Sequence, residues 1–201
     1  MLRSRSPLFW FFLAVFLVAV LTFLGPEEQS LGENVRIVYL HGAWVLAAEI
    51  TLGAAGLTGA LAILSRRETL QRWSAALGRT GIFFWVTYLP LSVWAMQANW
   101  NGLFTAEPRF RVAVIFAIAG LLLQFGLMLV ARPALTSLAN VLFVVILRFS
   151  LQGTDYVMHP PPSPIFNSGL LSIQLYFIGL VFLALAAAYF MTRWWLASQR
   201  P

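Results

Sequence analysis

The sequence contains no cysteine and no lysine, and it has only two histidines and seven acidic residues among 201. Without cysteine the chain has no disulfide, no thiolate metal site and no thiol nucleophile. Charged residues make up only 10% of the chain, whereas a soluble domain usually carries about 25%. This scarcity of charge excludes water as the main solvent of the chain.

Apolar residues dominate what is present, at 60% of the chain with a mean hydropathy of +0.82. A helix needs about 20 mostly apolar residues to cross the hydrocarbon core of a bilayer. Runs of roughly that kind cover residues 8–24, 38–64, 80–97, 112–131, 134–150 and 169–192. No period-two alternation typical of barrel strands occurs, so we expect an all-α, polytopic membrane helix bundle of about six transmembrane helices. We expect it to form a single integral membrane domain over residues 1–201.

Two of these runs need comment. The first follows Arg3 and Arg5 as a signal peptide would, but no A-x-A-like cleavage site follows it, so we interpret it as a retained helix. The fifth is the least secure, because Arg132-Pro133 leaves little space for a turn before it.

The arginines predict the orientation, because cytoplasmic loops of membrane proteins are enriched in basic residues. Nine of the thirteen arginines and one acid would share one side of the bundle, and they are Arg3, Arg5, Arg66, Arg67, Glu68, Arg72, Arg79, Arg132, Arg193 and Arg200. Most acids fall on the other side, so both termini are expected to be cytoplasmic. The net charge of +6 comes from arginines that flank apolar runs, which indicates a lipid bilayer rather than nucleic acid as the partner.

The two histidines, His41 and His159, both fall at the expected outer membrane boundary. Neutral imidazole is a good ligand for iron, and a histidine pair without a thiolate or carboxylate cluster suits haem better than a zinc site. Each residue could equally be an ordinary polar side chain at the interface. They are candidate ligands of one metal, with that alternative open.

The outer segment from Trp94 to Arg111 combines aromatic and basic residues. It could form a hydrophobic shelf for a flat macrocycle, with Arg109 or Arg111 pairing to its propionates. An ordinary aromatic belt at the level of the lipid headgroups explains the same tryptophans.

The second apolar run carries an ionisable residue and three glycines. Glu49 lies within this run, where an acid is costly and is a candidate functional residue by default. It could pair with Arg148, tune a ligand, relay a proton or simply be structural. Gly53, Gly56 and Gly59 provide a small-residue face that permits close helix packing.

Three stretches of the chain follow one another in the order of a known family. The first stretch is Arg36-Ile-Val-Tyr39-Leu-His41-Gly-Ala-Trp44. The second combines Gly81-Ile-Phe-Phe, Trp94, Trp100-Asn-Gly and Glu107-Pro-Arg109. The third is Arg148-Phe-Ser150 followed by Met158-His159-Pro160. Over about residues 35–165 they resemble the cytochrome c assembly family, most of all its CcmC-like, haem-handling membrane proteins. The tryptophan-rich loop of that family is degenerate here, because Leu103, Phe104, Ala106 and Glu107 stand where the family has tryptophans and an aspartate.

The resemblance implies a non-enzymatic protein of the bacterial plasma membrane that binds b-type haem at its outer face. The haem would be cargo or a resident cofactor, delivered with a periplasmic haem chaperone and ABC-type cytochrome c maturation subunits. The implied site residues are His41 and His159 as axial iron ligands, Trp94, Trp100 and Phe104 as a platform, and Glu107, Arg109 and Arg111 around the propionates. The alternative is a divergent paralogue that acts as a structural membrane subunit of a larger redox or transporter complex.

Overall fold

The computed structural model describes residues 6–155, 157 and 165–198. His159 therefore lies outside the described residues. The elements are α1 (Pro7–Phe23), α2 (Val35–Ser65), α3 (Glu68–Trp100), α4 (Pro108–Val130), α5 (Pro133–Gln152), the short 3₁₀ helix η1 (Phe166–Ser168) and α6 (Leu171–Ser198). The described part of the chain contains no β-strand. The predicted all-α bundle is confirmed, and each of the six predicted runs overlaps one α-helix.

Four helices, α2, α4, α5 and α6, are long and apolar enough to cross a membrane, which supports a multi-pass membrane protein. The apolar helix α1 is shorter, at 17 residues. The helix α3 is long but less apolar, because its first turns carry Glu68, Arg72 and Arg79, and it packs against α2, α4, α5 and α6. It buries Ser74, Thr80 and Ser92 among its neighbours.

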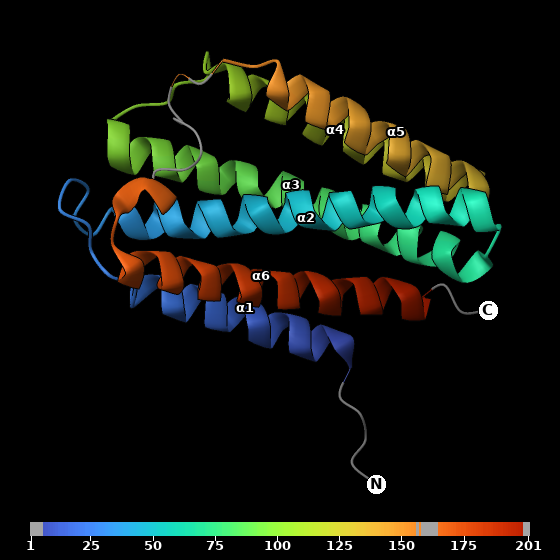
Figure 1. Cartoon of the computed structure of the whole chain (residues 1–201), viewed down its shortest axis with the longest axis horizontal. Coiled ribbons are helices and arrows are strands. Elements are labelled where there is room, and N and C mark those ends of the chain that lie inside the picture. Colours follow the sequence, from blue (N-terminus) through green and yellow to red (C-terminus); the bar gives the residue numbers. More distant parts are fainter. Residues whose placement is uncertain (1–5, 156, 158–164, 199–201) are drawn as a thin grey trace, which may run out of the picture.

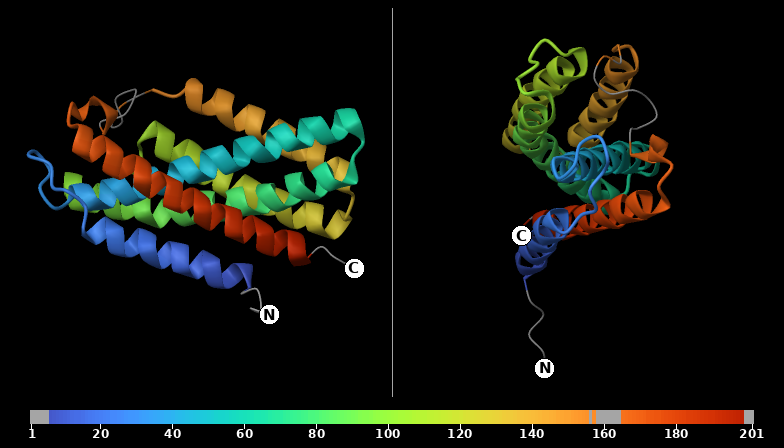
Figure 2. Two further views of the ribbon diagram at one scale, coloured as in Figure 1. Left: turned by 60° about the horizontal axis from the view of Figure 1, so that its bottom comes forward. Right: turned by 90° about the vertical axis from the view of Figure 1, so that its left-hand side faces the viewer.

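The antiparallel pair α2 and α3 forms the centre of the bundle (Figure 1). The helices α1 and α6 cover one side of this pair, and α4 and α5 cover the other (Figure 2). With 31 and 33 residues, α2 and α3 are roughly 46 Å and 50 Å long at 1.5 Å per residue. Both therefore exceed a hydrocarbon core of about 30 Å and must tilt or project beyond it.

Two tight turns close the arginine-rich end of the bundle. Between α2 and α3, Arg66 adopts a left-handed conformation with φ of 54° and Arg67 is extended. Between α4 and α5, Ala131 has φ of 52°, Arg132 is extended and Pro133 opens the next helix. Proline suits that position, since the first helical N–H has no partner within the helix. The fifth helix thus exists, because a turn of two residues is enough.

A buried hydrogen-bond network ties four helices together near this end. The Asn140 amide of α5 donates to the Ser74 backbone oxygen of α3 over 2.8 Å, and the Gln124 amide of α4 donates to the Asn140 side-chain oxygen over 2.9 Å. The Ser74 hydroxyl in turn donates to the Ala55 backbone oxygen of α2 over 2.9 Å. In lipid such interhelical bonds hold helices that have no hydrophobic effect between them.

The helices α2 and α5 diverge away from this end. A Cβ atom at Gly59 would lie 2.7 Å from the Ser137 backbone oxygen, and one at Gly56 would lie 3.3 Å from Val144 Cβ. At Gly53 no described atom lies within 4 Å of that position. The predicted close packing is correct for Gly59 and Gly56 and wrong for Gly53, because the α2–α5 distance grows along the helices. This divergence leaves open space at the opposite end.

Candidate functional site

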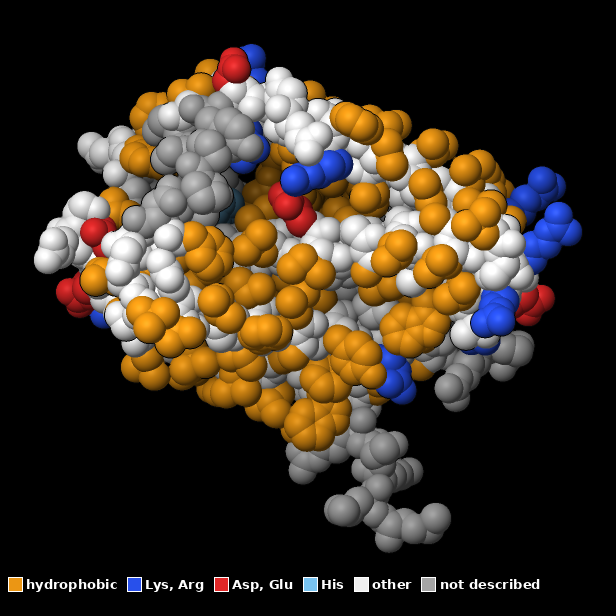
Figure 3. Space-filling view, in the orientation of Figure 1, with side chains coloured by type: hydrophobic (Ala, Val, Ile, Leu, Met, Phe, Trp, Pro, Cys, Tyr) orange, Lys and Arg blue, Asp and Glu red, His pale blue; other side chains and the backbone are white. Residues whose placement is uncertain are grey.

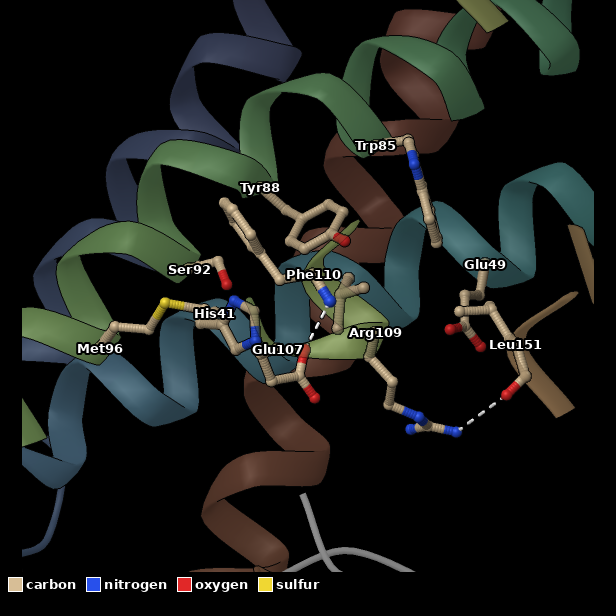
Figure 4. A pocket seen from close by; sticks show the side chains of 11 residues that line it. His41, Glu49, Trp85, Tyr88, Ser92, Met96, Glu107, Arg109, Phe110 and Leu151 are labelled. Atoms are coloured by element: carbon tan, nitrogen blue, oxygen red, sulfur yellow. Dashed lines mark hydrogen bonds between the residues drawn. The ribbon is translucent and has the colours of Figure 1, made fainter. Parts of the chain in front are cut away.

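A partly open cavity of about 120 Å³ lies between α2, α3, the start of α4 and the end of α5 (Figure 4). Its lining combines ionisable, polar and aromatic side chains with apolar ones: His41, Val45, Glu49, Trp85, Tyr88, Ser92, Met96, Glu107, Arg109, Phe110 and Leu151. Three of the eight predicted site residues, His41, Glu107 and Arg109, are among them. The fold therefore brings together residues from two of the motifs that carry the family resemblance.

His41 reaches the cavity from the second turn of α2. Its ring centroid lies 5.6 Å from that of Tyr88, with the two planes tilted by 48°. Tyr88 in turn packs edge-on against Trp85, at 5.1 Å between centroids. The Trp85 indole donates to the Ala113 backbone oxygen of α4 over 3.1 Å. This aromatic wall connects the histidine to α3 and α4 and limits the orientations of its ring.

Glu107 caps the N-terminus of α4. Its side chain accepts a hydrogen bond from the Phe110 backbone N–H, and the residue is only 4% exposed. A carboxylate here stabilises the helix, because it satisfies an N–H that lacks a helical partner and lies at the positive end of the helix dipole. Glu107 therefore has a structural role, whatever else it does in the cavity.

Arg109 and Glu49 supply opposite charges at the cavity. The Arg109 guanidinium donates to the Leu151 backbone oxygen at the end of α5 over 3.5 Å, which links α4 to α5. Glu49 of α2 interacts electrostatically with Arg148 of α5 and with Arg109. The candidate pairing of Glu49 with Arg148 thus has an electrostatic interaction in its favour, and Arg109 contributes a second one.

The remaining predicted site residues do not line this cavity. Trp94 is 52% exposed on α3, and Arg111 is exposed on α4. Trp100 ends α3 and packs edge-on against Phe104, at 6.1 Å between ring centroids. Trp100 and Phe104 form a separate aromatic pair at the end of the bundle that carries the loop between α3 and α4.

Sequence reasoning missed the contribution of α3. Trp85, Tyr88, Ser92 and Met96 all line the cavity, and they recur every three or four residues, which places them on one helix face. The same spacing is visible in the sequence. This spacing alone does not identify a site, because it does not say which face of α3 lies beside His41.

The donor chemistry of the cavity suits one edge of a haem better than a metal cluster. The described residues contain no group of three or more His, Cys, Asp or Glu that could hold a metal ion. His41 offers an imidazole for iron and Arg109 a cation for a propionate. The volume of about 120 Å³ is below the roughly 300–1,000 Å³ of pockets that enclose a small-molecule ligand. The cavity is therefore too small to enclose a haem.

The fold and its apolar helices define the class of the chain as a multi-pass α-helical membrane protein. Comparison with protein-family models, with curated proteins and with solved structures finds no match to the chain. The resemblance to the cytochrome c assembly family stays a prediction from its motifs.

Proposed function

We propose that the chain binds haem as cargo at the end of the bundle that carries His41, and delivers it during cytochrome c maturation in the bacterial inner membrane. The observation that supports this proposal best is the common cavity of His41, Glu107 and Arg109. His41 belongs to α2 and Arg109 to α4, and Glu107 is the N-cap residue of α4. Their convergence gives one imidazole and one guanidinium at a shared, partly open site.

Four residues of the cavity have distinct tasks in this proposal. Bound haem would supply an iron that accepts an axial nitrogen and propionates that pair with guanidinium groups. His41 binds the iron, and Tyr88 beside it limits how the imidazole turns. Arg109 attracts a propionate, and Glu107 holds the first turn of α4 so that Arg109 stays at the cavity. These residues bind and orient, so the proposed role is not enzymatic.

The second iron ligand in this proposal is His159, on the basis of the resemblance alone. Trp100 and Phe104 would contact the macrocycle or a partner from the exposed end of the bundle. The partners are those that the resemblance implies, namely a periplasmic haem chaperone and ABC-type maturation subunits.

The test is the visible spectrum of the detergent-purified protein, oxidised and reduced, for the wild type, His41→Ala and His159→Ala. Trp10→Ala serves as the control, because Trp10 is 41% exposed on α1 and does not line the cavity. We expect a six-coordinate haem signal that both histidine substitutions weaken and the control leaves unchanged. Arg109→Gln should lower haem content without changing the coordination of the haem that remains.

A wild-type protein without haem, prepared beside a haem-handling family member that carries it, contradicts the proposal. That result would favour a divergent paralogue that serves as a structural membrane subunit of a larger redox or transporter complex. The small volume of the cavity is the observation in favour of this second function.

A further inference from the structure

A second cavity, of about 260 Å³, opens between α2 and α5. It shares Glu49 and Leu151 with the first cavity, and its other lining residues are Leu46, Ile50, Leu52, Gly53, Val144, Leu147 and Arg148. We refer to this cavity as the α2–α5 groove. On the face that Figure 3 shows, a basic and an acidic side chain lie together among hydrophobic ones. The groove thus combines an apolar channel with two opposite charges.

The shape of the groove follows the helices. Leu46, Ile50 and Gly53 line it from α2, and Val144, Leu147 and Leu151 line it from α5. Each set spans eight residues, and the seven steps between the first and the last rise about 10 Å along a helix axis. The groove is therefore elongated in the direction of the helices, which is also the direction of lipid chains in a bilayer. An extended acyl chain can lie along a groove that runs in this direction.

Gly53 keeps the groove open. Glycine inside a helix is less favourable than alanine, and Gly56 and Gly59 are explained by the close approach of α5. No described atom lies within 4 Å of a Cβ built at Gly53, so close helix packing does not explain this glycine. Because a Cβ at this position meets open space and Gly53 lines the groove, a larger side chain here would extend into the groove.

Arg148 supplies a cation near the outer end of the groove. It is exposed, and it lies one turn before the end of α5 at Gln152. An arginine near the end of a transmembrane helix can extend its guanidinium to the headgroup region. There it can form charge-assisted hydrogen bonds with phosphate oxygens. The groove therefore matches an apolar chain that ends in a phosphate.

We propose that the α2–α5 groove holds one acyl chain of a bilayer phospholipid whose phosphate pairs with Arg148. An acyl chain suits a groove of about 260 Å³ better than a transmembrane helix does, because a helix with its side chains is about 10–12 Å wide. This proposal does not depend on haem binding at His41. A bound lipid would fill the gap that the divergence of α2 and α5 leaves.

The experiment uses the full chain in nanodiscs of phosphatidylethanolamine and phosphatidylglycerol. The protein is then extracted into mild detergent, and native mass spectrometry counts and identifies the retained molecules. Gly53→Leu fills the groove, and Arg148→Gln removes the cation. The matched controls are Gly179→Leu, at an exposed glycine of α6 with no described atom within 4 Å of its Cβ position, and Arg132→Gln, at an exposed arginine of the opposite end.

We expect one phospholipid to be retained by the wild type and by both controls. Gly53→Leu and Arg148→Gln should each reduce retention about tenfold, as the loss of one charge-assisted contact or of the acyl site predicts. Arg148→Lys should restore part of it. If Gly53→Leu fails to fold, the comparison of Arg148→Gln with Arg148→Lys decides the question. Equal phospholipid retention in all variants, or a wild type that retains no phospholipid, overturns the proposal.

Discussion

Gly59 of α2 lies so close to α5 that a Cβ atom on it would stand 2.7 Å from the Ser137 backbone oxygen. Because that oxygen belongs to a helix backbone, only movement of α5 can relieve the clash. We expect Gly59→Ala to lower the free energy of unfolding by about 1–3 kcal/mol. Gly53→Ala, in the same helix but in open space, should be neutral or stabilising by up to about 1 kcal/mol.

Thermal unfolding of both glycine variants in one detergent measures this difference. Equal effects at the two positions would show that helix propensity, and not the contact between α2 and α5, determines the outcome.

Asn140 should be the polar side chain on which the arginine-rich end of the bundle depends most. It is 2% exposed, donates to Ser74 and accepts from Gln124. Asn140→Leu leaves the Gln124 amide without this acceptor, so we expect a loss of about 1–3 kcal/mol. Thr58→Ala is the matched control, because the Thr58 hydroxyl donates only to backbone oxygens of its own helix. A loss for Asn140→Leu no greater than for the control would contradict the role of the network.

Glu107 offers a way to separate helix capping from haem binding. Glu107→Ala removes the acceptor of the Phe110 N–H and should cost about 0.5–2 kcal/mol of stability. Glu107→Asp should retain most of that stability, since aspartate is among the best capping residues. Unfolding temperature and haem content are measured on the same samples. If haem content falls in Glu107→Asp while stability does not, the carboxylate acts on the haem itself and not only through the cap.

The absence of cysteine allows a direct test of orientation. Gln29 and Arg67 are both exposed and lie in loops at opposite ends of the bundle. Because basic residues collect on the cytoplasmic side, a membrane-impermeant maleimide should label Gln29→Cys in intact cells. It should label Arg67→Cys only after the membrane is permeabilised. The reverse pattern would invert the predicted topology and move the His41 cavity to the cytoplasmic face.

The six helices could be predicted because apolar run length is a local property of the chain. Each run needs only enough residues to cross the bilayer, and backbone hydrogen bonding in lipid makes it a helix. Even the turn at Arg132-Pro133 is local, since Pro133 begins a helix and Ala131 ends one. The helix α3 was predicted too short, at residues 80–97, because its first turns are polar. Those turns fold as helix because they pack on α2 and α5.

The candidate site could be predicted only in part, because the sequence of one helix does not show which side chains of other helices lie beside it. His41, Glu107 and Arg109 could be named from motifs, but their common cavity depends on where α4 begins relative to α2. Tyr88 and Met96 have no distinctive sequence signal. In the sequence, Trp94 was a candidate for the aromatic platform that supports haem. In the structure it is 52% exposed on α3 and does not line the cavity.

The sequence by itself determined a membrane bundle of six helices, because hydropathy and backbone hydrogen bonding act within each segment. Only the tertiary structure decided which glycines allow close helix packing and which one faces open space. Gly59 and Gly53 are the same residue type in one helix, but α5 lies against the first and not against the second. The divergence of the two helices is a property of all the side chains between them, and it opens the α2–α5 groove.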